Sequence, residues 1–288
     1  MKRWPLFAAL LLLLGFAIIS GCSTLDERQR AWIFQPSDRS WSGGLAAAEG
    51  MEDVWIDFKP ATGDEPARLH GLWHPSEHAS GPILLYLHGA RFNVTGSAPR
   101  MRRMQELGFS VLGVDYRGFG KSTPALPSEE SAYEDARAAW DWLAKKYPGR
   151  PRYVFGHSLG GPIAIHLAAE VGDESGTIVE STFTSIADVV STSKWGWMPV
   201  SLLITQRFEA ARKVSKIGSP LLVVHGGEDR LILPDLGRKL YDAAVLPKLF
   251  VLVEGGSHHN TNSIGQAQYR QALAQLFSMN SLAASAAP

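Results

Sequence analysis

The chain has 288 residues, of which 45% are hydrophobic and 19% are charged, which is the composition of a globular protein with enough apolar side chains for a large core. Its length fits one large α/β domain or two small ones. The 28 basic and 28 acidic side chains balance, so the charge argues against nucleic acid or another strongly charged partner. The sequence contains no internal repeat and no Cys/His spacing typical of a zinc site.

The N-terminus has the pattern of a secretory signal. Lys2 and Arg3 form a positive start, residues 6–19 are apolar, and small residues lead to Cys22, the single cysteine of the chain. The apolar stretch is short for a membrane-spanning helix, which needs about 20 residues. The alternative is an uncleaved membrane anchor in which Cys22 is incidental. Because one cysteine cannot form an internal disulfide, the fold must be held by packing.

Ile19-Ser20-Gly21-Cys22 resembles the bacterial lipobox. The resemblance implies that residues 1–21 are a lipoprotein signal peptide and that Cys22 is diacylglyceryl-modified, so that the membrane is a partner through this lipid. Several acyl chains on one residue anchor a protein stably, whereas one chain does not. Ser23, a non-aspartate after the cysteine, is typical of outer-membrane sorting in Gram-negative lipoproteins. The implied location is the bacterial cell envelope, at the outer membrane and facing the periplasm.

Residues 22–50 are predicted to be a lipid-anchored lead-in segment. Leu25–Ile33 is predicted as a short helix, which residues 34–36 break. Trp32, Phe34 and Trp41 make the segment too apolar for a linker. We therefore expect it to pack on the domain that follows.

Residues 51–280 are predicted to form one α/β domain. Alternating apolar and polar side chains at 54–58 and 68–73, with turn residues at 62–64, predict an antiparallel hairpin. Further strands are expected at 83–87, 111–114, 153–155, 177–180, 221–224 and 249–253, and helices at 100–107, 129–146, 159–169, 236–244 and 264–277. This alternation predicts a mostly parallel sheet with helices on both faces. Residues 281–288 are predicted to be a disordered tail.

Residues 181–218 lie between two predicted strands and are too many for a simple loop. We expect at least one helix among them and interpret the stretch as a small cap. Its aromatic side chains, among them Trp195, Trp197 and Phe208, are candidates to line an apolar or acyl-binding pocket. The alternative is that these helices pack on the sheet.

The run Gly-His-Ser-Leu-Gly-Gly at residues 156–161 lies directly between a predicted strand and a predicted helix. In that context, G-x-S-x-G is typical of a nucleophile elbow. Gly156 and Gly160 stand two residues either side of Ser158, where a Cβ would crowd a sharp turn. The turn would present the serine hydroxyl at the positive end of the following helix. The alternative is a Gly/Ser turn that only starts a helix.

A serine hydroxyl needs a base to remove its proton and an acid to orient that base. In G-x-S-x-G hydrolases these partners follow in the order Ser, Asp, His. Asp229 follows the predicted strand 221–224, and His258 follows the predicted strand 249–253. Because catalytic groups of open α/β sheets gather outside the carboxyl ends of the strands, all three loops are predicted to share one edge.

These motifs together resemble the α/β-hydrolase superfamily, specifically the minimal-cap group that includes bacterial exported hydrolases and eukaryotic protein depalmitoylases. The resemblance covers residues 54–277 and rests on five motifs in the family's order. They are His88-Gly89, residues 115–122 (Asp-Tyr-Arg-Gly-Phe-Gly-Lys-Ser), the elbow, residues 225–229 (His-Gly-Gly-Glu-Asp) and residues 255–258 (Gly-Gly-Ser-His).

The resemblance implies that Ser158 is the nucleophile, His258 the general base and acid, and Asp229 the orienting carboxylate. It also implies an oxyanion hole made by the backbone N–H groups of Ala90 and Leu159. The implied activity is that of a serine hydrolase of the carboxylesterase or thioesterase type, without cofactor or metal. Its substrate would be a small molecule or an acylated partner carrying an apolar chain such as palmitate.

Two positions have alternatives. The base could be His258 or His259, and the spacing from Gly255 favours His258. The acid could be Glu228 or Asp229, and Asp229 occupies the position that the family uses. Arg91 is either a contact for an anionic substrate or a solvated loop arginine.

The function also has alternatives. The same triad can cleave amides, as in aminopeptidases of the prolyl type, or serve haloperoxidase or acyltransferase chemistry. Ser158 at the nucleophile position argues against a dehalogenase, which uses aspartate there. A non-catalytic binding lipoprotein on the same fold is the non-enzymatic alternative, although such a scaffold has no need of Ser158 and His258 together.

Overall fold

The computed structural model describes residues 21, 23–40, 42–63, 65–78, 80–192 and 203–279. The predicted signal peptide, Cys22, the predicted tail, and Trp41, Trp195 and Trp197 lie outside the described residues. None of the helices in those ranges combines the length and the hydropathy that crossing a bilayer requires.

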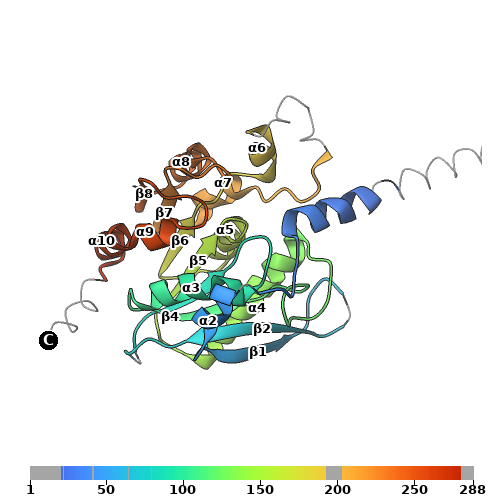
Figure 1. The fold of residues 1–288 in the computed structure, drawn as a ribbon, viewed down its shortest axis with the longest axis horizontal. Helices are drawn as coiled ribbons and strands as arrows, with labels where there is room; N and C mark the ends of the chain where they lie inside the picture. The colour runs from blue at the N-terminus through green and yellow to red at the C-terminus, as the bar shows by residue number, and fades with distance from the viewer. Residues whose placement is uncertain are drawn as a thin grey trace, which may run out of the picture.

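Within the described residues the strands form one eight-stranded sheet in the order β1-β2-β4-β3-β5-β6-β7-β8 (Figure 1). β1 pairs antiparallel with β2, β2 pairs antiparallel with β4, and every later pairing is parallel. The predicted mixed sheet with an N-terminal antiparallel hairpin is therefore confirmed. The strands are β1 Glu52–Phe58, β2 Ala67–His74, β3 Ile83–Leu87, β4 Ser110–Val114, β5 Arg152–His157, β6 Gly176–Glu180, β7 Leu221–Gly226 and β8 Lys248–Val253.

The helices connect these strands and cover both faces of the sheet (Figure 1). Residues 23–34 are also helical. The remaining helices are α2 Ser42–Ala48, α3 Val94–Gln105, α4 Glu129–Lys146, α5 Gly160–Glu170, α6 Ile186–Ser191, α7 Ala210–Lys213, the 3₁₀ turn η2 Val214–Lys216, α8 Pro234–Ala243, α9 Thr261–Ile264 and α10 Gln266–Phe277.

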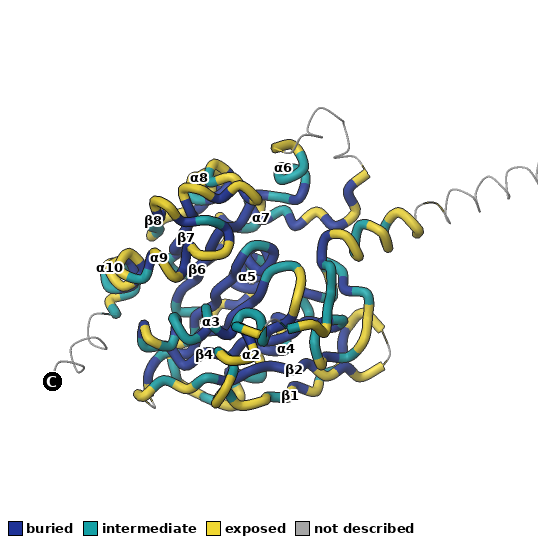
Figure 2. Tube along the Cα trace, in the orientation of Figure 1, coloured by how far each residue is buried: buried dark blue, intermediate teal, exposed yellow. Residues whose placement is uncertain are grey.

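The central strands are buried on both faces, as Figure 2 shows, because successive side chains point to opposite sides of the sheet. In β3, Leu85 and Leu87 pack in the cluster that α4, α5 and α8 cover, whereas Leu84 and Tyr86 pack in the cluster that α3 and α10 cover. Strands with two buried faces read as continuous apolar runs, and this pattern is what predicts the central strands from the sequence.

Three helical elements differ from the prediction. α3 begins at Val94, six residues before the predicted start at Arg100, and Pro99 lies inside it. The early start is stabilised because the buried carboxylate of Asp115 accepts the backbone N–H of Val94 at 2.6 Å. The predicted last helix, 264–277, is α10 and begins two residues later, at Gln266. The short helix α9, which was not predicted, precedes it, and the two meet at Gly265, where a Cβ would lie 2.8 Å from a Val253 methyl. The alanine-rich α2 was not predicted.

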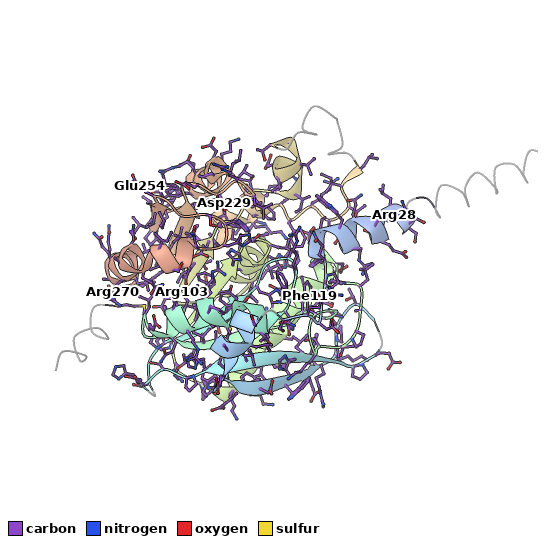
Figure 3. The ribbon with its side chains drawn as sticks, viewed as in Figure 1. Arg28, Arg103, Phe119, Asp229, Glu254 and Arg270 are labelled. Atoms are coloured by element: carbon purple, nitrogen blue, oxygen red, sulfur yellow. The ribbon has the colours of Figure 1, made fainter. Side chains whose placement is uncertain are left out.

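The lead-in segment is joined to the domain by Phe34, which is fully buried. Its ring packs edge-on against Phe119 and Phe208, with ring centroids 6.4 and 5.8 Å apart. Phe119 lies in the interior of the molecule (Figure 3), and Phe208 is itself fully buried and packs against Tyr133. The N-terminal helix and the end of the predicted cap are thus fixed to one aromatic cluster.

We expect Phe34→Ala to lower the free energy of unfolding by about 3–5 kcal/mol, because it removes a buried ring and leaves a cavity. Guanidinium unfolding followed by circular dichroism measures this change. Trp32→Ala, two residues away and 64% exposed, is the matched control and should change stability by no more than about 0.5 kcal/mol. Equal losses in the two variants would contradict the role given to Phe34.

Candidate active site

Ser158 stands in a sharp turn between β5 and α5, with a positive φ of 53°. This left-handed conformation costs a non-glycine residue on the order of 1–3 kcal/mol. The turn is possible because its flanking residues are glycines: a Cβ at Gly156 would lie 2.2 Å from the Gly160 carbonyl oxygen, and one at Gly160 would lie 2.1 Å from that of Leu87. The local structure is therefore the strand–turn–helix that the sequence predicted.

Hydrogen bonds from the neighbouring strand hold this turn. The backbone N–H of Ser158 donates to the carbonyl of Glu180 at 3.0 Å, and the hydroxyl of Thr182 donates to the carbonyl of Ser158 at 2.9 Å. Both partners come from the end of β6 and the residues just after it. The position of the Ser158 hydroxyl thus depends on a second strand as well as on its own.

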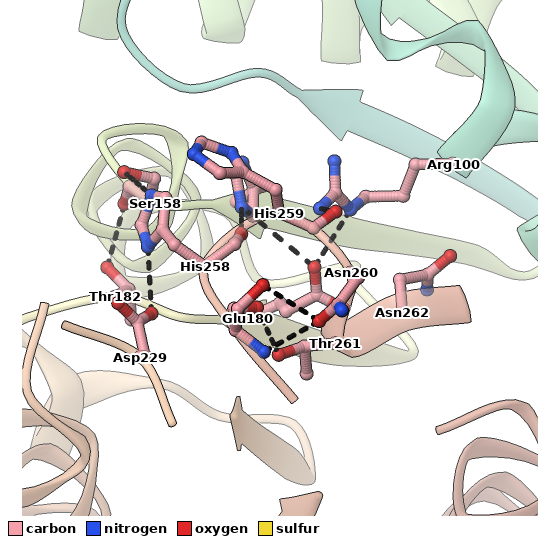
Figure 4. Close-up of polar contacts among 12 residues, drawn as sticks. Arg100, Ser158, Glu180, Thr182, Asp229, His258, His259, Asn260, Thr261 and Asn262 are labelled. Carbon is pink, nitrogen blue, oxygen red and sulfur yellow. Dashed lines mark hydrogen bonds and ion pairs between the residues drawn. The ribbon is translucent and has the colours of Figure 1, made fainter. Parts of the chain in front are cut away.

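Ser158, His258 and Asp229 form one chain of hydrogen bonds at the carboxyl ends of β5, β7 and β8 (Figure 4). Ser158 Oγ lies 3.0 Å from His258 Nε2, and His258 Nδ1 lies 2.8 Å from Asp229 Oδ2. His258 and Asp229 are both buried, whereas the neighbouring His259 and Glu228 are exposed. In the structure, His258 makes the hydrogen bond to Ser158, and Asp229 makes the hydrogen bond to His258.

Asp229 is fixed by backbone donors as well as by imidazole. Its Oδ1 accepts the N–H groups of Leu231 and Ile232 at 3.0 and 2.9 Å. Burial alone would raise the pKa of Asp229, but its interactions with His225 and His258 and the Ile232 N–H hold that pKa well below its usual range. Asp229 is therefore ionised at neutral pH, and it can orient the imidazole and stabilise a positive charge on it.

The loop after β3 lies directly against Ser158. A Cβ at Gly89 would be 3.1 Å from the Ser158 Cβ, so Ala90 follows at the point where the chain passes Ser158. The carbonyl of His88 accepts the Tyr116 hydroxyl at 3.1 Å, and His88 Nδ1 donates to the carbonyl of Gly89 at 2.7 Å. Leu159, whose N–H is the second predicted oxyanion donor, follows Ser158 at the start of α5.

Asp115 and Arg117 support the surrounding loops. Asp115 is buried, and its carboxylate oxygens lie 3.4 Å from His88 Nε2 and 3.4 Å from His70 Nδ1. Burial favours a raised pKa, but hydrogen bonds with the two histidines keep the pKa of Asp115 below its usual value. Arg117 pairs with Glu134 and Asp135 of α4, in each case at 2.6 Å. Both residues hold loops in place.

A buried polar network under the histidine loop was not found from the sequence. Glu180, which is fully buried at the end of β6, accepts Arg100 Nε at 2.8 Å (Figure 4). It also accepts the Tyr269 hydroxyl. Arg100 Nη2 in turn donates to the carbonyl of His259 at 3.4 Å. One signal pointed to it: Glu180 is a charged residue that ends an otherwise apolar buried strand.

His157 holds the same loop from the other side. Burial, with the nearby Arg100 and His258, lowers the pKa of His157 well below its usual value, so the ring is neutral. Its Nε2–H donates to the carbonyl of His258 at 3.1 Å. Two adjacent carbonyls of the loop, those of His258 and His259, are therefore each held by a side chain from a different element.

No group of three or more His, Cys, Asp or Glu side chains in the described part of the chain is arranged to hold a metal ion. The side chains that the structure brings together at this site are those of a serine, a histidine and an aspartate. A hydroxyl next to an imidazole that is oriented by a carboxylate is a nucleophile with its general base.

The sequence of the chain is similar to those of known proteins. Residues 79–208 match the family described as "Serine aminopeptidase, S33". An uncharacterized protein of Mycobacterium tuberculosis is 32% identical over 248 residues, covering 84% of this chain and 85% of the relative. Lysophosphatidylserine lipase ABHD12 of Danio rerio is 30% identical over 225 residues, covering 71% of this chain and 58% of the relative.

Solved structures share the fold. A Pyrococcus furiosus esterase superimposes with a TM-score of 0.65 at 19% identity, covering 85% of this chain and 97% of the esterase. The chain belongs to the α/β-hydrolase superfamily. Within it, the family match over residues 79–208 and the lipase relative support a serine hydrolase.

We expect Glu180→Gln to lower the free energy of unfolding by about 3–5 kcal/mol, because the variant leaves the charge of Arg100 buried without its counter-ion. The control is Asp141→Asn in the exposed Arg137–Asp141 pair, whose side chains are 51% and 58% exposed. That variant should cost about 1 kcal/mol at most. Chemical denaturation of both proteins makes the comparison, and a loss for Glu180→Gln no larger than the control would show that the buried pair is not needed.

Proposed function

We propose that the protein is a membrane-tethered serine hydrolase that cleaves carboxylic esters or thioesters through a Ser158–His258–Asp229 triad. The observation that carries the proposal is the continuous hydrogen-bond chain of 3.0 and 2.8 Å that joins the three side chains. Asp229 would accept the Nδ1–H of His258, which leaves Nε2 unprotonated and facing the serine hydroxyl.

In the first half of the reaction, Ser158 Oγ attacks the acyl carbonyl while His258 Nε2 takes the serine proton. The carbonyl oxygen becomes an oxyanion, and the backbone N–H groups of Ala90 and Leu159 would donate to it. When the tetrahedral intermediate collapses, the alcohol or thiol leaves with the proton from His258. Ser158 then carries the acyl group as an ester.

In the second half, water attacks the acyl-enzyme, and His258 takes a proton from that water. A second tetrahedral intermediate forms with its oxyanion in the same place and collapses to release the carboxylic acid. His258 returns the proton to Ser158 Oγ, so the enzyme ends in its starting state. Every step uses side chains of this chain, with water as the only co-reactant.

An acyl ester of a lipid is the substrate that we favour. It is supported by the 30% identical relative whose name describes a lysophosphatidylserine lipase, and by the lipid proposed on Cys22, which would keep the enzyme at a membrane. The second candidate is amide hydrolysis, which the name of the matching family, a serine aminopeptidase, favours. Rates on matched ester, thioester and amide substrates with one acyl chain distinguish the candidates.

We expect a fluorophosphonate probe to label the wild-type protein, and both Ser158→Ala and His258→Ala to abolish the labelling. Asp229→Asn should reduce kcat for an ester by roughly 10⁴-fold, because the imidazole would then be held in the wrong tautomer. His259→Ala is the matched control and should keep labelling near the wild-type level. Labelling that persists in Ser158→Ala would place the nucleophile elsewhere.

We also propose that lipid on Cys22 tethers the mature protein to the cell envelope, at the outer membrane and facing the periplasm. In cells fed an alkyne-tagged fatty acid, the wild-type chain should incorporate the tag and sediment with membranes. Cys22→Ala should lose the tag, and Ser158→Ala should keep it, since catalysis is not needed for lipid attachment. A tagged Cys22→Ala protein would contradict the lipobox interpretation.

A further inference from the structure

The helix of residues 23–34 has one face that is bonded to the domain. Asp26 Oδ1 accepts the Gln206 side chain at 2.9 Å, and Arg30 Nε donates to the carbonyl of Pro127 at 3.0 Å. Ile33 and Phe34 continue this face into the core. The helix is therefore held in a fixed orientation, and its other side faces outward.

Two large apolar side chains stand on the outward side. Leu25 is 38% exposed and Trp32 is 64% exposed. They are seven residues apart, which is close to two full helical turns, so they point in nearly the same direction. A helix that packs on protein with one face usually carries polar residues on the opposite face, which meets water. Leu25 and Trp32 depart from this pattern.

Leu203 extends this apolar surface. Gln29, which lies between Leu25 and Trp32 on the helix, donates its side-chain N–H to the carbonyl of Leu203 at 2.7 Å. Leu203 is 59% exposed. Single exposed apolar residues need no explanation, but a contiguous group of them marks a contact surface. We call Leu25, Trp32 and Leu203 the apolar strip.

The end of the same helix is bonded to the loop beside the nucleophile. The carbonyl of Phe34 accepts the backbone N–H of Arg91 at 2.9 Å, and Gln35 Oε1 accepts Arg91 Nε at 2.9 Å. Arg91 follows Ala90, and the next residue, Phe92, has an aromatic side chain that is 48% exposed. The helix that carries the apolar strip is therefore bonded at its C-terminal end to the loop that passes Ser158.

The chain itself indicates what covers the strip. Cys22 directly precedes this helix, so the lipid proposed on Cys22 and the membrane that holds it lie at the Leu25 end. Tryptophan favours the interface between lipid and water, and an amphipathic helix can lie in that plane. Arg28, which Figure 3 shows on this helix, is an exposed cation next to the strip and suits anionic headgroups.

We propose that the apolar strip contacts the lipid bilayer and seats the N-terminal helix in its surface, so that the Ser158 site takes acyl esters directly from the membrane. This inference rests on the proposed hydrolase function and adds to it a docking surface that sets the physical form of the substrate. A second copy of this chain is the other occupant that the experiment distinguishes.

The test compares the full chain in phospholipid vesicles with a strip variant, Leu25→Gln with Trp32→Gln and Leu203→Gln. The control variant carries Trp55→Gln, Val245→Gln and Leu252→Gln, three exposed apolar positions toward the two far edges of the sheet. Each protein is assayed on a long-chain acyl ester embedded in the vesicles and on the water-soluble ester p-nitrophenyl butyrate. Guanidinium unfolding confirms that all three proteins are folded.

We expect the strip variant to lose roughly tenfold or more in kcat/KM on the embedded ester, because each apolar side chain lost weakens contact with lipid. Its rate on p-nitrophenyl butyrate should stay within about twofold of wild type, as should both rates of the control variant. A strip variant that hydrolyses the embedded ester at the wild-type rate would overturn the proposal.

A second measurement does not depend on catalysis. A photoactivatable phospholipid in the same vesicles should label residues 23–40 of the Ser158→Ala protein, and the strip substitutions should reduce that labelling roughly fivefold or more. If neither ester is cleaved but this labelling is seen, the hydrolase proposal fails and the docking surface remains. If no labelling is seen, or if the strip substitutions convert a dimer into a monomer on sedimentation, lipid docking is wrong.

Discussion

The left-handed turn at Ser158 is the constraint on which the rest of the site depends. The turn exists because no side chain stands at Gly156 or Gly160, where a Cβ would lie within about 2.2 Å of backbone oxygen. Its strain is offset by hydrogen bonds with Glu180, which ends β6, and with Thr182, which lies just after β6. The serine hydroxyl is thus held at the carboxyl edge of the sheet, which is the edge that the loops carrying Asp229 and His258 also reach.

The loops around Ser158 are held by groups that take no part in the proposed reaction. Asp115 stabilises the start of α3 and lies beside His88, so one buried carboxylate supports the loop that carries Ala90. On the opposite side, His157 and Arg100 hold consecutive carbonyls of the histidine loop. Preorganisation of this kind is what lets a triad act without rearranging its surroundings.

The fold could be predicted from the sequence because buried strands and amphipathic helices leave a local pattern, and α4 spans the predicted residues 129–146. The meeting of Ser158, Asp229 and His258 followed from the position of each after a strand. The Arg100–Glu180–Tyr269 network could not be predicted, because its members are 80 and 89 residues apart and nothing local pairs them. Similarly, the start of α3 depends on Asp115, 21 residues away.

Glu180, at the end of β6, makes two structural contacts, one through its backbone and one through its side chain. Its backbone carbonyl accepts the N–H of Ser158, and its carboxylate holds Arg100, which reaches the loop of His258 and His259. A thermal displacement of this strand end would therefore carry Ser158 and His258 in the same direction. The distance between the two side chains would change less than either position, so the hydrogen bond between them would survive fluctuations of the sheet.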